Sequence, residues 1–380
     1  MIKKKVFLRI DQTTEMIKLV ILRHGQSSLN HENIFCGWID AALTEKGLQQ
    51  ASEASNLIYD HFVTLKENGD AEHASKTKDE SQLPTVGFAS RLVRTNQTIA
   101  QIIKTLEQRS SPDNHHFDGV DEYHIVECKK NADINTAVQD KGQIVYKPVQ
   151  QDGKDDNSGE YKGFKVYESW RLNERHYGSW QGQRKPQVLQ KYGKDEYMRI
   201  RRDYNGKPPS VDLNKEMEVV PAALQQEMDK ENRGSAVPKE IQSKPMVPTG
   251  SELVYDFKEP NRSLKYKDEY TYGNFLDLPT AESLNDVIHR LQSYLYDFMI
   301  PKILATDNKT GLIVAHGSSV RSLLKILCNI SEEDIKNVDI PNGIPLVVEL
   351  KEDFTFMKRY YLDPEQAKIN AEKVRNEGFQ

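Results

Sequence analysis

Short apolar runs alternate along the chain with stretches in which apolar residues recur at helical spacing. Mostly apolar runs occupy positions 17–22, 85–89, 311–315 and 346–350. Unbroken runs of this length are typical of strands that are buried on both faces. Helical spacing begins at Thr44 and recurs over 91–106, 282–304 and 319–327. Strands separated by helices predict an α/β fold, with a doubly wound, mostly parallel sheet and helices on both of its faces.

Three polar stretches interrupt this pattern, at about 66–83, 109–165 and 205–263. The third holds seven of the 16 prolines of the chain and only two aromatic residues. Such compositions are typical of loops or disorder, although 142–146 (GQIVY) is apolar enough to add a strand. Without these inserts about 246 of the 380 residues remain, which is an ordinary size for one domain.

The inserts also account for the acidity of the chain. They carry 19 of the 52 basic and 26 of the 57 acidic residues, so the remainder is slightly basic and suits an anionic substrate. The net charge of −5 and the pI near 6.1 give no support to nucleic-acid binding.

Two further classes of protein are disfavoured by the sequence. No run approaches the roughly 18 apolar residues that span a membrane, and the apolar stretch at the start is too broken for a signal peptide. The three cysteines, Cys36, Cys128 and Cys328, form no CxxC pair. This usage fits a protein of the reducing cytoplasm rather than a disulfide framework or a zinc cluster.

Two histidines followed by glycine stand where predicted strands end. Arg23-His24-Gly25 follows the first strand, and His316-Gly317 follows the strand at 311–315. Ligands of doubly wound sheets bind at the carboxyl ends of the strands, and an arginine beside a histidine can bind a phosphate. A surface histidine would explain the first tripeptide equally well, but two such ends in one sheet are harder to explain by packing.

Longer segments resemble a known family. They are RHGQSSLN at 23–30, SRLVRTNQT at 90–98, NERHYG at 173–178, IRRDY at 200–204 and AHGSSVRSLLKIL at 315–327, in family order. The chain is similar to the cofactor-dependent phosphoglycerate mutases of the histidine phosphatase superfamily, and looks most like a fungal paralogue with inserts. The NERHYG segment separates this branch from the general phosphatases of the superfamily.

The resemblance implies an isomerase of glycolysis and gluconeogenesis that interconverts 2- and 3-phosphoglycerate. His24 would carry the phosphoryl group as phosphohistidine, with 2,3-bisphosphoglycerate as the primer and without a metal. Arg23, Arg94 and a protonated His316 would stabilise the group in transfer. Glu174 would act as general acid and base. The implied substrate-binding residues are Asn30, Cys36, Gly37, Arg175, Tyr177, Lys185, Arg201, Arg202, Gly317 and Ser318.

Two departures from the family pattern leave alternatives open. Cys36 stands where the mutases carry Thr or Ser, and Ser318 stands where they carry Asn. Losing a hydroxyl contact costs about 0.5–1.5 kcal/mol. The alternatives are therefore a bisphosphoglycerate synthase or phosphatase activity at the same site, or a catalytically weak paralogue kept for binding or regulation, to which the inserts would contribute.

The resemblance also implies what the two ends of the chain form and which partners the protein binds. Residues 1–15 are predicted to be an N-terminal extension, because the family usually starts like Met16 and the residues after it. Residues 16–380 are predicted to form a single domain with the three inserts. The tail from Leu362 is expected to form a short helix and a mobile end that limits access of water to the pocket. The expected partners are small phosphoglycerates in the cytoplasm, neither nucleic acid nor membrane, and a homo-oligomer is compatible with the family.

Overall fold

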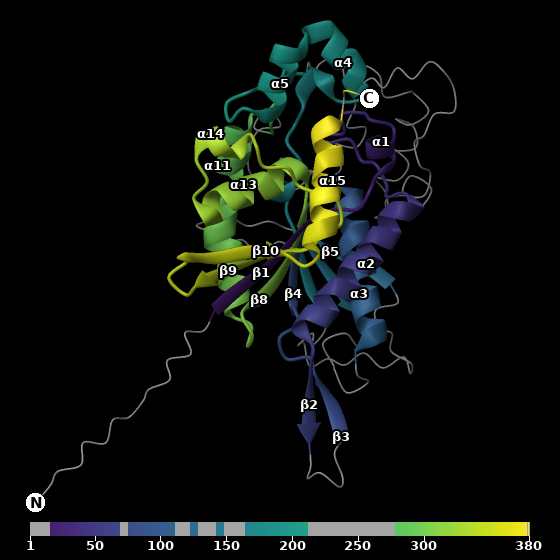
Figure 1. Cartoon of the computed structure of the whole chain (residues 1–380), viewed down its shortest axis with the longest axis vertical. Coiled ribbons are helices and arrows are strands. Elements are labelled where there is room, and N and C mark those ends of the chain that lie inside the picture. Colours follow the sequence, from purple (N-terminus) through teal and green to yellow (C-terminus); the bar gives the residue numbers. More distant parts are fainter. Residues whose placement is uncertain are drawn as a thin grey trace, which may run out of the picture.

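The computed structural model describes residues 16–68, 75–110, 122–127, 142–147, 164–211, 278–377 and 379. Eight strands form one sheet in the order β10-β9-β1-β8-β4-β7-β6-β5 (Figure 1). The four central strands are parallel: β1 (Met16–Arg23), β8 (Thr310–Ala315), β4 (Val86–Ala89) and β7 (Lys165–Glu168). Both edges are antiparallel: β9 (Leu346–Lys351) with β10 (Phe356–Tyr361), and β6 (Gly142–Lys147) with β5 (Glu122–Glu127).

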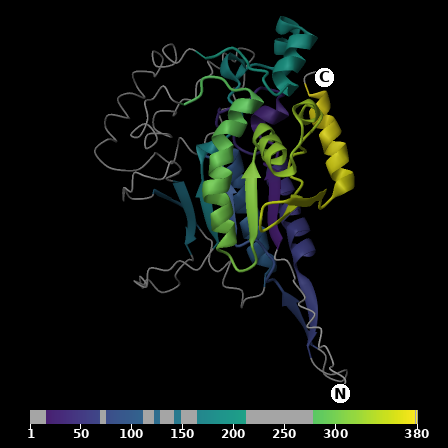
Figure 2. The same ribbon diagram turned by 90° about the vertical axis from the view of Figure 1, so that its left-hand side faces the viewer.

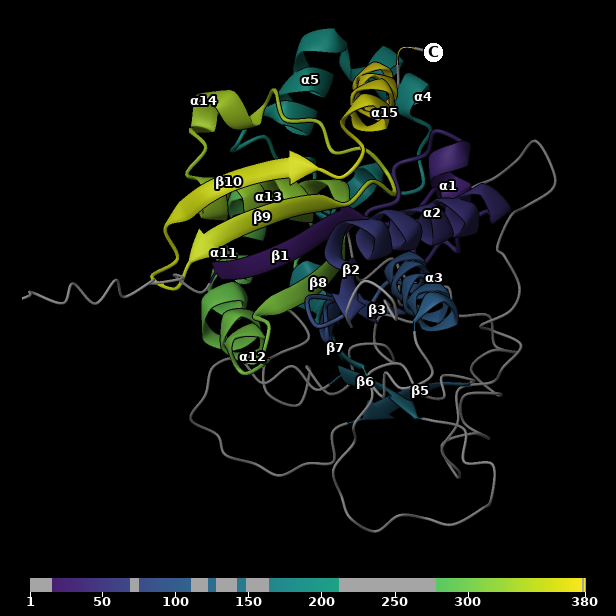
Figure 3. The ribbon, with the colours of Figure 1, turned by 60° about the horizontal axis from the view of Figure 1, so that its bottom comes forward.

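The central strands divide their side chains between two cores. In β1, Ile17, Leu19 and Ile21 belong to one cluster, whereas Val20 and Leu22 belong to the other. Successive side chains of a strand point to opposite faces, so an unbroken apolar run needs cover on both sides. The first face is covered by α11 (Leu284–Ser293), α12 (Ile300–Leu304) and α13 (Gly317–Cys328). The second face is covered by α2 (Glu45–Phe62) and α3 (Val93–Arg109) (Figures 2 and 3). The predicted α/β class with helices on both faces is confirmed, and the sheet is parallel only at its centre.

Local signals set the helix boundaries. Helix α2 (Glu45–Phe62) begins after Thr44, whose hydroxyl accepts a hydrogen bond from the Gly47 amide at 3.1 Å. Such a side chain satisfies one of the amides that the first turn leaves free. Helix α3 (Val93–Arg109) presents Ile99, Ile102 and Ile103 to the core. Both helices lie where the helical spacing predicts them.

The predicted helix at 282–304 is present but irregular. Ser283 and Asp286 form a capping box at the start of α11 (Leu284–Ser293), a π-helical turn (Tyr294–Met299) follows, and α12 (Ile300–Leu304) ends the segment. Pro301 has no amide hydrogen to bond four residues back, which explains why the regular ladder stops near this point. Helix α13 (Gly317–Cys328) follows β8 directly.

A further layer lies beyond the carboxyl ends of the parallel strands (Figure 1). It consists of α1 (Ser28–His31), α4 (Lys185–Tyr192), α5 (Lys194–Arg202), α14 (Glu332–Ile335) and α15 (Pro364–Asn376), with short 3-10 turns at Trp170–Leu172 and Gly178–Trp180. A separate aromatic cluster that includes Phe35, Trp180 and Tyr197 holds α4 and α5 together. This layer covers the carboxyl ends of the parallel strands. Helix α15 confirms the predicted helix in the tail.

The inserts differ from one another. The expectation of loops or disorder is wrong for 66–68 and 75–79, because β2 (Thr64–Asn68) and β3 (Ser75–Asp79) pair as antiparallel strands that project from the sheet (Figure 1). Backbone pairing satisfies the amides and carbonyls of this segment whatever its composition. In the second insert, the predicted strand at 142–146 is confirmed as β6, which pairs with β7.

Other expectations fall on residues that the structure does not describe. They are the extension at 1–15, most of the inserts at 109–165 and 205–263, and Cys128. Among the residues described, no helix combines the length and apolarity that a membrane span requires.

Candidate active site

Strands β1 and β8 end side by side, and each is followed by a histidine. Arg23 pairs with Ala315 in the parallel register, so His24 and His316 leave neighbouring strands at the same edge of the sheet. Both imidazoles are buried, and their ring centroids lie 5.0 Å apart in an edge-to-face arrangement. The two His-Gly pairs that the sequence places at strand ends therefore come together.

The hydrogen bonds of His24 define its tautomer. Nδ1 lies 2.6 Å from the Gly25 carbonyl oxygen, and Nε of Arg94 donates to Nε2 at 3.2 Å. Because an arginine N–H can only donate, Nε2 is the bare nitrogen and Nδ1 carries the proton. Burial, and then the charges of Arg94 and Arg23, hold the pKa of His24 well below its usual value. His24 is therefore a neutral imidazole with a lone pair on Nε2.

His316 is oriented by two hydroxyls. Its Nε2 lies 2.7 Å from Oγ of Ser90, which is 2.7 Å from Oγ1 of Thr95. Thr95 donates to the Leu92 carbonyl at 2.8 Å, so the Ser90 hydroxyl donates to Thr95 and accepts from Nε2 of His316. Nδ1 of His316 is then the bare nitrogen, and it is buried without a hydrogen-bond partner in the described part of the chain.

Positive charges surround His316. Burial, followed by the charges of Arg94, His24 and Arg23, holds the pKa of His316 well below its usual value. These neighbouring charges disfavour a further cation. The protonated His316 that the family resemblance implies for the transfer step stays a prediction.

Arg94 and Arg23 border the two histidines. Arg94 lies in the first turn of α3, and its guanidinium donates to the carbonyls of Ile39 at 2.9 Å and Gly37 at 2.8 Å. Gly37 has a φ of +50° and no room for a Cβ beside the Gln181 side chain. Arg23 donates to the Ile340 carbonyl at 3.1 Å, and its buried Nε has no hydrogen-bond partner among the described residues. The guanidinium groups of Arg23 and Arg94 are therefore both held near His24.

Glu174 is held through its backbone and one carboxylate oxygen. Its carbonyl accepts from Nε1 of Trp38 at 2.7 Å and from Arg290 at 3.0 Å. Oε1 accepts from the amides of Arg175 at 2.8 Å and Ser318 at 3.1 Å. Oε2 lies 3.6 Å from where a Cβ of Gly317 would be. The carboxylate is thus held at the N-terminus of α13, and its second oxygen, Oε2, remains available to the pocket.

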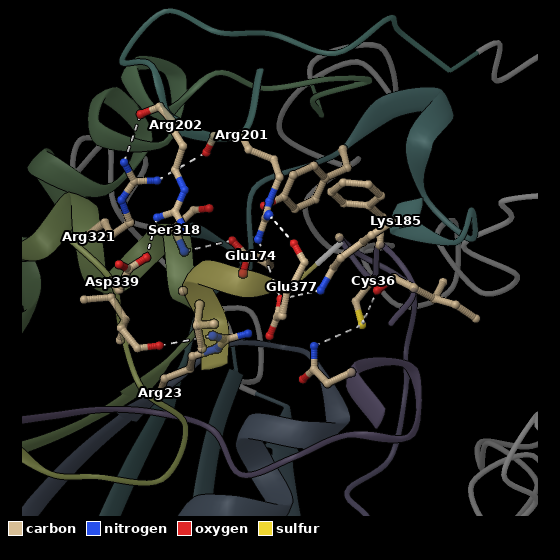
Figure 4. Close-up of a pocket in the computed structure, with 18 of the residues that line it drawn as sticks. Arg23, Cys36, Glu174, Lys185, Arg201, Arg202, Ser318, Arg321, Asp339 and Glu377 are labelled. Atoms are coloured by element: carbon tan, nitrogen blue, oxygen red, sulfur yellow. Dashed lines mark hydrogen bonds and ion pairs between the residues drawn. The ribbon is translucent and has the colours of Figure 1, made fainter. Parts of the chain in front are cut away.

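Arg23 and Glu174 border a pocket that opens to solvent (Figure 4). Its lining includes eleven of the residues implied by the family resemblance: Arg23, Asn30, Cys36, Gly37, Glu174, Tyr177, Lys185, Arg201, Arg202, Gly317 and Ser318. His24, Arg94, Arg175 and His316 are not part of the lining, and the first two connect to it through the contacts described above. Residues from five separate parts of the chain therefore meet at one cationic pocket.

Arg175 takes a different position from the one expected for a substrate-binding residue. Its buried guanidinium donates to the carbonyls of Ile200 at 2.8 Å, Arg201 at 3.3 Å and Gly206 at 3.3 Å, and stacks on Tyr177 at 4.6 Å. Burial raises the pKa of Tyr177, but the charge and hydrogen bond of Arg175 and the charge of Arg201 together lower it, and the net shift is downward. Arg175 therefore fixes the end of α5 rather than lining the pocket.

The two departures from the family pattern lie in the pocket wall. Sγ of Cys36 is 3.9 Å from both Oγ of Ser27 and Nδ2 of Asn30, and burial raises the pKa of its thiol. The amide of Ser318, which was expected to serve the substrate, donates to Glu174 instead.

Three charged residues of the pocket were missed by the sequence analysis: Arg321, Asp339 and Glu377 (Figure 4). Arg321 is the charged residue among the otherwise uncharged buried residues of α13, and that contrast could have indicated it. Its guanidinium donates to the carbonyls of Arg202 at 3.0 Å and Ile335 at 2.8 Å. Asp339 and Glu377 lie in segments without a motif, and no local pattern indicates them.

Comparisons with known proteins point to one family. Residues 19–143 match the model of the histidine phosphatase superfamily (branch 1). Phosphoglycerate mutase 2 of Saccharomyces cerevisiae is 46% identical over 96% of this chain and 97% of its own length. Phosphoglycerate mutase 3 of the same yeast is 45% identical over 97% and 98%, respectively. A 2,3-bisphosphoglycerate-dependent phosphoglycerate mutase of Borreliella afzelii is 29% identical over 96% and 99%.

Proposed function

Because the chain belongs to the phosphoglycerate mutase family of the histidine phosphatase superfamily, we propose that it interconverts 2- and 3-phosphoglycerate through a phosphohistidine at His24. The observation that carries the proposal is the state of His24. A neutral imidazole has its bare Nε2 beside Arg94, whose guanidinium also donates to Gly37 in the wall of the pocket. This is the form of histidine that can act as a nucleophile towards phosphorus.

In the first transfer, Nε2 of His24 bonds to phosphorus as the bond between phosphorus and a glycerate oxygen breaks. Glu174 gives a proton to that oxygen, so the bisphosphoglycerate leaves as a monophosphoglycerate with a free hydroxyl. Arg23, Arg94 and, once it is protonated at Nδ1, His316 stabilise the charge on the remaining phosphoryl oxygens, because the protein already holds these side chains near His24. Protonation of Nδ1 of His316 is favoured only when the phosphoryl group brings negative charge to the pocket.

In the second transfer, the other hydroxyl of a bound phosphoglycerate attacks the phosphohistidine. Glu174 takes the hydroxyl proton, the N–P bond of His24 breaks, and the phosphoryl group passes to the substrate oxygen. A bound bisphosphoglycerate that turns round in the pocket can then return its other phosphoryl group to His24. The net result moves the phosphoryl group between the two hydroxyls and restores the phosphohistidine.

The donors of the pocket fit 2,3-bisphosphoglycerate as the primer that first loads His24. Nε of Arg23, Nε of Arg321 and Nη2 of Arg202 are buried and have no hydrogen-bond partner among the described residues. Unpaired buried N–H groups are costly, and the anionic groups of the primer would satisfy them.

A phosphoenzyme assay tests the proposal. Protein mixed with 2,3-bisphosphoglycerate labelled with ³²P should gain acid-labile label, and His24→Ala should gain none while keeping its unfolding transition. A coupled assay with added primer should then detect turnover of 3-phosphoglycerate. Absence of both label and turnover in the folded wild-type protein would refute the proposal.

The Cys36 contact favours one second candidate, a bisphosphoglycerate synthase or phosphatase at the same site. At 3.9 Å, the thiol is a weaker partner for Asn30 than the hydroxyl of the family would be. A looser pocket wall gives water better access to the phosphohistidine. Product analysis by ³¹P NMR separates the two functions, since release of inorganic phosphate faster than isomerisation indicates the phosphatase.

A further inference from the structure

The C-terminal segment places a carboxylate of its own inside the pocket. Glu377 follows the last residue of α15, and its Oε2 lies 2.5 Å from Nζ of Lys185 and 3.7 Å from Nη2 of Arg201 (Figure 4). Its carbonyl oxygen accepts from Nη1 of Arg201 at 2.7 Å and from the Tyr197 hydroxyl at 3.4 Å. The side chain and the backbone of Glu377 thus both contact Arg201, and the side chain also contacts Lys185.

The helix itself does not explain this position. An acidic side chain at the carboxyl end of a helix is disfavoured by the helix dipole, which prefers a cation there. The cations of the pocket supply the missing stabilisation. Burial raises the pKa of the Glu377 carboxyl, but Lys185, Arg23 and Arg201 outweigh it and lower the pKa to about 2. Glu377 is therefore ionised at neutral pH and remains bound to the pair.

The same cations are needed by the ligand. The Lys185 and Arg201 side chains are 7% and 9% exposed, and both line the cavity that Glu377 enters. Two carboxylates cannot share one ammonium group and one guanidinium group at these distances without strong repulsion. An anionic group of the substrate at this end of the pocket must displace Glu377.

We propose that Glu377 is an internal competitor of the substrate, which holds Lys185 and Arg201 and yields them only to a ligand with a second anionic group. This inference rests on the proposed function, since it names what the second anionic group of a phosphoglycerate has to displace in the same pocket. A lone phosphate that binds beside His24 leaves Glu377 in place. A phosphoglycerate also offers a carboxylate, and it competes with Glu377 directly.

Titration calorimetry with 3-phosphoglycerate and with inorganic phosphate tests this role. In Glu377→Gln the competing charge is gone, so 3-phosphoglycerate should bind roughly three- to tenfold more tightly than to wild type. Affinity for inorganic phosphate should change by less than about twofold, since that ligand does not need the pair. Glu372→Gln is the matched control, because Glu372 is exposed on the same helix and its loss should change neither affinity.

Each outcome decides the question. Unchanged or weaker binding of 3-phosphoglycerate to Glu377→Gln would overturn the inference. Removing a residue that merely anchors the tail would leave the affinity unchanged or lower it. An equal gain for both ligands would overturn it too, as a general effect of charge. A selective gain without phosphoenzyme formation at His24 would support the role of Glu377 and refute the proposed reaction. Absence of 3-phosphoglycerate binding to all three proteins would refute both.

Discussion

Replacing Asp339 with asparagine should destabilise the protein through the arginines that its carboxylate neutralises. The Asp339 side chain is 3% exposed, and it pairs with Nη1 of Arg202 at 2.5 Å and with Nε of Arg375 at 2.8 Å. The Arg202 side chain is 11% exposed and that of Arg375 is 65% exposed. The two ion pairs of one carboxylate therefore differ in solvent access, and so should their energies.

The magnitude follows from this difference. Removing one partner of a buried pair costs about 3–5 kcal/mol, since the other charge stays buried. The amide of asparagine can still accept one hydrogen bond, which reduces the expected loss to about 2–4 kcal/mol. The exposed pair with Arg375 contributes about 0–1 kcal/mol. Arg321 adds to the effect, because burial lowers its pKa to about 9 and the Asp339 charge opposes that shift.

Urea unfolding measures the effect, and Arg375→Ala is the control that removes only the exposed partner. Asp339→Asn should lower the free energy of unfolding by about 2–4 kcal/mol, and Arg375→Ala by less than about 1 kcal/mol. Inorganic phosphate should stabilise Asp339→Asn more than wild type, because the anion replaces the missing negative charge. A loss below about 1 kcal/mol for Asp339→Asn, or equal losses for both variants, would refute this reasoning.

Three further predictions concern the catalytic end of the pocket. Cys36→Thr should restore a hydroxyl partner for Asn30 and raise kcat/KM in the coupled assay about two- to tenfold; a decrease would show that the thiol is better suited to this pocket. Arg94→Gln should slow formation of the labelled phosphoenzyme by about 10²–10³-fold and raise the pKa of His24, seen by NMR, because a cation is lost beside it; a faster reaction would contradict the assigned role. The pKa values of His24 and His316 are lowered in the folded state. The stability that the neutral imidazoles contribute is therefore present above the pKa of a free histidine, about 6.5. This contribution is lost as the pH falls towards the pKa values of the folded state. Urea unfolding should therefore show a smaller pH-dependent loss below about pH 6.5 for His24→Gln than for wild type, and identical profiles would argue against buried neutral imidazoles.

The central fold was readable from the sequence because its signals are local. Unbroken apolar runs such as 17–22 have to be covered on two faces, and Thr44 marks a helix start through its own side chain. Parallel strands then bring their carboxyl ends to one edge, so His24 and His316 could be placed near each other before any coordinates. The pairing of 64–68 with 75–79 was missed, because backbone pairing can organise a polar segment that composition alone assigns to a loop.

The chemistry of the pocket depended on contacts between distant segments. Motifs predicted which residue types meet in the pocket. The charge of His316, however, depends on arginines from β1 and α3. The guanidinium of Arg175 donates to a carbonyl of α5. Glu377 lies 192 positions from Lys185 and belongs to no motif, yet its carboxylate accepts a hydrogen bond from Nζ of Lys185 in the pocket. Apolar periodicity and helix caps act over a few residues, so they are visible in the chain itself. Electrostatic interactions act through space, and only the folded structure decides which charges become neighbours.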